Sequence, residues 1–172
     1  MKYLTFFVLL IIFVSILTCS NDSSLDFSIE IIEIDKEDGV INLESTLVNR
    51  SNQNLLLFMP IKGFTAKDRI IDSEGEEFSY AASVTPAMSP DLYFVLGPGK
   101  TYKWNYSIRE ESTGIPEVGE EPFKFEESET YYIKLHYWMS DYVHPSNNNV
   151  DLIVQDDFYT GNVESNTITV KY

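Results

Sequence analysis

Cysteine is nearly absent from this chain of 172 residues, which contains only Cys19. A single cysteine cannot form an intramolecular disulfide, so the chain is not one of the small disulfide-stapled domains found among secreted proteins. Its stability must come from a hydrophobic core instead. A chain of this length is long enough to bury one.

Basic residues are also scarce. Only 12 lysines and arginines stand against 27 aspartates and glutamates, which gives a net charge of −15 at pH 7. Nucleic-acid binding depends on clustered Lys and Arg side chains that neutralise phosphates, so we expect no nucleic-acid partner. The excess of carboxylates favours solubility and repulsion from anionic surfaces.

The chain has only two histidines, His136 and His144. A catalytic triad or a zinc site would need one of them, and zinc takes about four ligands, or three and a water. The alternation in YYIKLHYW places His136 on the wetter face of a strand, whereas His144 lies in a loop near Asp141. No G-x-S-x-G elbow and no Gly-rich phosphate loop occurs. We therefore expect no enzyme, no cofactor and no metal.

Long hydrophobic runs are confined to the N-terminus. Lys2 is followed by FFVLLIIFV and SILTC, a charged start, an apolar middle and a polar exit that are typical of a secretory signal. The apolar stretch from Leu4 to Leu17 has about 14 residues, fewer than the roughly 20 that a helix needs to cross a bilayer core. We predict a signal peptide over residues 1–18, with a membrane anchor helix as the alternative.

Cys19 stands at the end of that signal. The segment ILTC resembles a bacterial lipobox, in which an aliphatic residue lies three positions before a cysteine that is diacylated and becomes the mature N-terminus. The resemblance implies lipid attachment at Cys19, with residues 19–26 as that cysteine and a polar tether. Ser20 after the cysteine is compatible with sorting to the outer membrane. Cleavage after Ser20, which would discard Cys19, is the alternative.

Residues 27–172 show the period of two that indicates half-buried strands. In TYKWNYSI, residues 101–108, and in VINLESTLV, apolar and polar side chains alternate. NLLLFM has no polar side, and FSIEIIEI shifts parity as a bulged or doubly covered strand does. About eight or nine short strands separated by turns predict an all-β fold, an antiparallel β-sandwich, with an open barrel as the alternative.

Several segments resemble, in chain order, a bacterial immunoglobulin-like family that includes domains similar to the intracellular proteinase inhibitors. They include a strand ending in an Asn turn, a Pro-Gly turn before an alternating strand, and Tyr-bearing strands near the C-terminus. These segments are STLVNRSNQNLLL, RIIDSEGEEF, VLGPGKTYKWNYSI, ETYYIKLHYW and YTGNVESNTITVKY. The resemblance implies an immunoglobulin-like sandwich over residues 27–172. It leaves peptidase inhibition as an alternative function only, because fold does not fix function.

Carboxylates crowd the Gly- and Pro-bearing segment 109–129, which favours a solvated loop. They are Glu110, Glu111, Glu117, Glu120, Glu121, Glu126, Glu127 and Glu129. Two carboxylates about 5 to 10 Å apart in a cleft could hydrolyse a glycosidic bond, so a hydrolase is the least favoured alternative. Calcium binds loop oxygens, although no spaced loop motif is present here. The side chains available to calcium are Asp141, Asp151, Asp156 and Asp157.

Aromatic side chains gather toward the C-terminus. They are Tyr131, Tyr132, Tyr137, Trp138, Tyr142, Phe158 and Tyr159. Tyr and Trp are common both in sheet cores and in contact surfaces. Alternation puts Tyr132 and Trp138 on the face of their strand that also carries Lys134. We therefore expect either that these two rings form an exposed contact patch or that they take part in ordinary sandwich packing.

Together these features predict a non-catalytic, lipid-anchored, extracytoplasmic module of a bacterial cell envelope that binds an envelope protein or glycan or serves as an assembly part. The lipid on its N-terminal cysteine would attach it to the membrane. A sandwich exposes loops at its ends, so loops 85–91, 109–129 and 140–149 are the expected contact regions. A secreted or envelope-bound peptidase inhibitor is the alternative.

Overall fold

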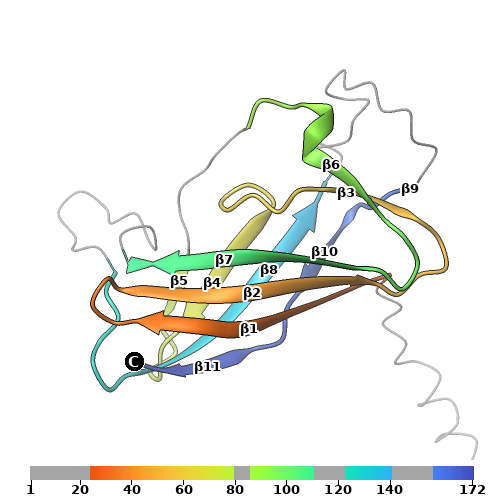
Figure 1. Cartoon of the computed structure of the whole chain (residues 1–172). Helices are drawn as coiled ribbons and strands as arrows, with labels where there is room; N and C mark the ends of the chain where they lie inside the picture. Colours follow the sequence, from red (N-terminus) through yellow and green to blue (C-terminus); the bar gives the residue numbers. More distant parts are fainter. Residues whose placement is uncertain (1–23, 80–85, 111–122, 141–156) are drawn as a thin grey trace, which may run out of the picture.

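The computed structural model describes residues 24–79, 86–110, 123–140 and 157–172, and its regular structure is nearly all β-strand (Figure 1). The prediction of an all-β chain is confirmed. The helical element in this part of the chain is one short 3-10 turn, Pro90–Leu92. Within the same ranges, no helix is both long and apolar enough to span a membrane.

The front sheet in Figure 1 has the order β1-β2-β7 and is antiparallel throughout. It consists of β1 (Leu25–Asp35), β2 (Val40–Asn49) and β7 (Thr101–Arg109). The alternation predicted for VINLESTLV is confirmed, because Ile41, Leu43 and Leu47 are fully buried. The strand expected from Phe27 begins at Leu25, whose side chain already lies in the core. The register of β1 on β2 shifts at Ile32, so the predicted bulge is confirmed.

The rear sheet has the order β10-β8-β4-β5, and β11 also pairs with β8. It consists of β4 (Ala66–Ile71), β5 (Glu77–Ser79), β8 (Thr130–Met139), β10 (Gly161–Glu164) and β11 (Ile168–Lys171). The closing segment YTGNVESNTITVKY forms two strands, because Ser165 interrupts the pairing. Its hydroxyl accepts from the N–H of Leu135 at 2.9 Å, and its own N–H donates to the Leu135 carbonyl at 2.9 Å. This break helps to raise the described strands to eleven, more than the eight or nine expected.

A third, smaller sheet lies at one end of the other two (Figure 1). It consists of β3 (Leu55–Phe58), β6 (Tyr93–Leu96) and β9 (Asp157–Phe158), in the order β6-β3-β9. All four side chains of β3 are buried, as the absence of a polar side in NLLLFM predicts. The short pairing of β3 with β9 is parallel.

The two larger sheets are layered as in a sandwich, and their strands cross obliquely in Figure 1. Their inner faces contribute to one cluster of buried side chains, with Ile41 and Leu43 from β2 and Ile133 and Leu135 from β8. Leu57 of the third sheet belongs to the same cluster. The outer faces carry mainly charged and polar side chains, with Tyr132 and Trp138 of β8 among the exceptions.

One side chain joins the layers along their edge. Asn166 lies between β10 and β11, and its Oδ1 accepts from the backbone N–H of Ile29 at 2.8 Å. Its Nδ2 donates to the carbonyl of Ile29 at 3.2 Å. Asn166 therefore satisfies both backbone groups of one residue in β1, as a neighbouring strand would.

β2 ends at Asn49, which is fully buried and links three segments. Its Nδ2 donates to the carbonyls of Leu96 at 2.7 Å and Gln53 at 2.8 Å, and its Oδ1 accepts from the N–H of Ser51 at 2.9 Å. Its own carbonyl accepts from the N–H of Gly99 at 2.9 Å. Gly99 has a φ of 66°, which favours glycine, so the predicted tight turn at GPGK is confirmed.

A second buried polar group connects the two larger sheets. Asp68 of β4 is fully buried, and its Oδ1 accepts from the hydroxyl of Tyr106 in β7 at 2.7 Å. The Nζ of Lys62 lies 3.9 Å from the same oxygen and donates to the carbonyl of Ser107 at 2.8 Å. Burial lowers the pKa of Lys62, whereas the charge of Asp68 opposes this change.

Candidate functional site

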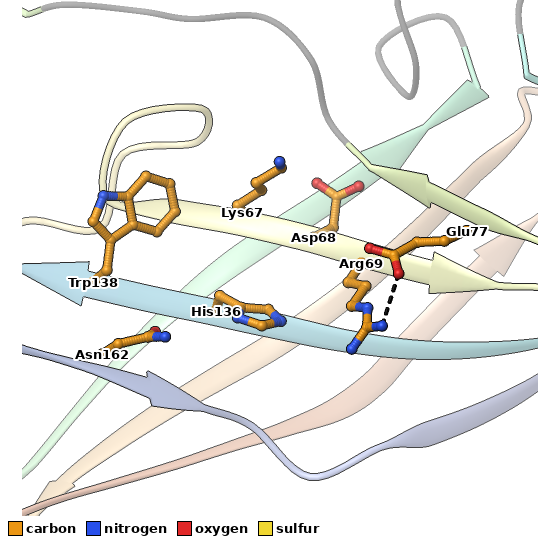
Figure 2. A pocket seen from close by; sticks show the side chains of 7 residues that line it. All are labelled: Lys67, Asp68, Arg69, Glu77, His136, Trp138 and Asn162. Carbon is orange, nitrogen blue, oxygen red and sulfur yellow. Dashed lines mark ion pairs between the residues drawn. The ribbon is translucent and has the colours of Figure 1, made fainter.

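The outer face of the rear sheet carries a pocket of about 480 Å³ (Figure 2). Ligand pockets in proteins have volumes of roughly 300 to 1,000 Å³, so this one is large enough for a small ligand. It is lined by Lys67, Asp68, Arg69, Glu77, His136, Trp138 and Asn162. These residues come from β4, β5, β8 and β10, which lie side by side in the sheet.

Strand alternation gathers these side chains. Lys67 and Arg69 alternate with buried residues of β4, and His136 and Trp138 alternate with buried residues of β8. Antiparallel pairing sets Lys67 opposite His136, and it sets Asn162 of β10 opposite Trp138. The carboxylate of Asp68 is the exception among the lining groups, because it is bonded to Tyr106 in the core.

An ion pair lies at one end of the pocket. The Nη2 of Arg69 is 2.7 Å from the Oε2 of Glu77 (Figure 2). Their hydrogen bond raises the pKa of the Arg69 guanidinium and lowers the pKa of the Glu77 carboxyl. Both side chains are well exposed, so the pair contributes little to stability, and we regard it as a feature of the pocket.

A second carboxylate sits beside the pocket. The Oε2 of Glu164 lies 3.2 Å from the Nζ of Lys134, and its Oε1 lies 3.6 Å from the Nδ1 of His136. The outer face therefore carries charges of both signs in alternation. It is not a patch of one sign.

Two nitrogen atoms in the pocket wall are unpaired. The Nε of Arg69 and the Nε2 of His136 are buried and have no hydrogen-bond partner among the residues that the structure describes. Figure 2 shows the His136 imidazole pointing toward the Arg69 guanidinium. Buried polar atoms nearly always have a partner, so a water or a ligand oxygen is expected near this point.

The structure separates the aromatic residues that the sequence grouped together. Tyr131 and Tyr137 are core residues, which is ordinary sandwich packing. Tyr132 is 43% exposed, and Trp138 is partly exposed on the same outer face of β8. His136 lies between them, on the face predicted for it. Tyr142 and His144 lie outside the described residues.

Sequence reasoning missed five of the seven lining residues, which are Lys67, Asp68, Arg69, Glu77 and Asn162. In β4 every second side chain is buried, but the charged Asp68 at a buried position hides this alternation in the sequence. The outward position of Lys67 depends on β4 beginning at Ala66. Glu77 begins β5 and pairs with Ile71 of β4.

Two of the clustered glutamates have structural contacts. An Oε1 atom of Glu110 accepts from the N–H of Phe125 at 2.9 Å, and one of Glu129 accepts from the N–H of Ser73 at 3.1 Å. Hydrogen bonding, mainly from Ser73, lowers the pKa of Glu129. The glutamates at 111, 117, 120 and 121 lie outside the described residues.

A second hollow, of about 400 Å³, combines acidic and aromatic side chains. It is lined by Asp72, Glu74, Glu76, Phe78, Phe123, Lys124, Glu126, Glu129 and Tyr131. Across the four described ranges, no group of three or more His, Cys, Asp or Glu side chains is placed to hold a metal ion. Of the candidate calcium ligands, Asp157 begins β9, and Asp141, Asp151 and Asp156 fall outside the described residues.

Comparison with protein-family models finds no match to this chain, and a search of curated proteins finds none either. The function therefore has to be argued from the pocket itself. Its groups are hydrogen-bond donors, a carboxylate acceptor, an amide and an indole, which is a set suited to recognition.

Proposed function

We propose that this chain is a lipid-anchored, extracytoplasmic binding module of a bacterial cell envelope, with an immunoglobulin-like sandwich and no catalytic role. The observation that carries the proposal is the pocket on the outer face of the rear sheet. It is concave and of ligand size, and polar groups converge in it beside an aromatic ring. The proposed binding surface is thus a sheet face that includes Trp138 and shares the outer side of β8 with Tyr132.

The tether supports this arrangement. Cys19 is followed by only a few residues before β1 begins at Leu25. Since an extended residue spans at most about 3.6 Å, the first strand would start no more than about 22 Å from a lipid on Cys19. Such a short tether keeps the domain near the membrane and its envelope partners.

Replacing Cys19 by serine tests the anchor. We expect Cys19→Ser to move the protein from the membrane fraction to the soluble fraction and to remove the mass of the lipid, because serine provides no thiol for acylation. Intact-mass spectrometry and fractionation measure both effects, with Ser20→Ala as the control that keeps the thiol. A mature chain that begins at Asn21 would refute lipid attachment.

A photo-crosslinking residue on the outer face tests the binding site. A crosslinker that replaces Tyr132 would face the same side of the rear sheet as the pocket. The control position is Lys103, which lies on the front sheet and pairs with Glu44. We expect adducts with envelope components from position 132 and few or none from position 103, as measured by gel shift and mass spectrometry. No adduct at either position, or equal adducts at both, would contradict the proposed function.

A further inference from the structure

The chemistry of this pocket points to a class of ligand. We propose that it binds a neutral oligosaccharide, with the indole of Trp138 stacked on one sugar ring and the Arg69–Glu77 pair bonded to hydroxyl groups. The inference rests on the proposed function, because it concerns the same pocket.

The pocket carries charged groups of both signs, and this balance favours a neutral ligand rich in hydroxyl groups. A simple anion would meet the carboxylate of Glu77, and a simple cation would meet Lys67 and Arg69. A hydroxyl group both donates and accepts, so it can bond to either kind of group. The ion pair at 2.7 Å holds a donor and an acceptor side by side, which matches two neighbouring hydroxyl groups of a sugar ring.

The unpaired nitrogen atoms fit the same ligand. The Nδ1 of His136 faces a carboxylate oxygen of Glu164 at 3.6 Å, whereas its Nε2 has no hydrogen-bond partner among the described residues. The Nε–H of Arg69 is a donor. A single hydroxyl group near both atoms can bond to each of them, because a hydroxyl both donates and accepts.

The spacing of Trp138 and Tyr132 indicates how long a ligand that contacts both rings would be. In Figure 2 Trp138 stands at one end of the pocket and the Arg69–Glu77 pair at the other, with His136 between them. A sugar ring has an apolar face that packs on a flat indole and a polar rim that needs hydrogen bonds. Tyr132 lies six residues along the same face of β8, which is roughly 20 Å from Trp138. An extended chain of several sugars can therefore contact both rings.

The test uses the full-length chain purified in detergent and an array of neutral oligosaccharides of hexoses and N-acetylhexosamines. We expect binding to at least one of them, with little dependence on salt because the ligand carries no charge. Trp138→Ala should weaken binding about tenfold, and Trp138→Phe should weaken it less because a ring remains. Calorimetry with the array hit measures each affinity, and thermal melts show that each variant is folded.

Matched ion pairs provide the control. Arg69→Gln or Glu77→Gln should weaken binding about tenfold, whereas Lys103→Gln, which breaks the pair with Glu44 on the front sheet, should leave it unchanged. The saccharide proposal would be overturned if Lys103→Gln weakened binding as much as Arg69→Gln or Glu77→Gln. It would also be overturned if Trp138→Ala left the affinity for the oligosaccharide unchanged. A silent array with protein adducts from position 132 would overturn it and leave the binding module intact. A silent array without adducts would remove both proposals.

Discussion

Replacing Asn49 by leucine should lower the free energy of unfolding by about 3 kcal/mol or more. Leucine has nearly the same shape but cannot donate to the carbonyls of Leu96 and Gln53 or accept from the N–H of Ser51. Each buried group left without a partner costs about 1 to 3 kcal/mol. Urea unfolding followed by circular dichroism measures the loss.

Asn105→Leu is the matched control, because Asn105 is exposed on β7 and the same substitution should change stability by no more than about 0.5 kcal/mol there. Asn49→Asp keeps the acceptor for Ser51 but removes both donated bonds, so it should also be strongly destabilising. Equal small losses for Asn49→Leu and Asn105→Leu would show that the turn does not depend on the buried amide.

Removing one partner of the buried pair between the sheets should be the other large effect. Lys62→Met leaves the buried Asp68 carboxylate without its cationic neighbour while keeping the Tyr106 hydroxyl, and we expect it to cost about 3 kcal/mol. Asp68→Leu should cost a similar amount, because it leaves the ammonium and the Tyr106 hydroxyl without that carboxylate. The double variant should cost less than the sum of the two, since no unpaired charge remains. Urea unfolding of all four proteins completes the cycle.

The pH dependence gives an independent check on the same lysine. Burial lowers the pKa of Lys62 in the folded protein, so between that pKa and about 10.5 the unfolded chain binds more protons at this position. Lys62 therefore makes stability rise with pH in this window, and Lys62→Met should remove its contribution. Additive losses in the cycle would show that Lys62 and Asp68 act independently. A pH profile left unchanged by Lys62→Met would show that burial does not lower the pKa of Lys62.

The alternation of apolar and polar residues predicted most strands, because in a half-buried strand every second side chain faces the core. The turn at GPGK, the bulge near Ile32 and the wet face of β8 were all predicted from neighbouring residues. The break between β10 and β11 was not predicted. It depends on hydrogen bonds between Ser165 and Leu135, which are far apart in the sequence.

The pocket shows the same limit. Alternation places His136 and Trp138 on an outer face, but it cannot say that Lys67 lies opposite His136 or that Asn162 lies opposite Trp138. Those neighbours are set by the register between strands that are distant in the chain. The expected contact regions were loops 85–91, 109–129 and 140–149, whereas the pocket lies on the sheet itself, and most of the last two loops falls outside the described residues.

The amide of Asn166 has a consequence for crowding. If the proposed lipid anchor holds copies on one membrane, they would meet at high local concentration and in similar orientations. An open strand edge on one copy would then be a template for another. By capping both backbone groups of Ile29, Asn166 interrupts that template in the middle of β1. A single amide side chain thus makes the edge of β1 a poorer template for a strand of another copy.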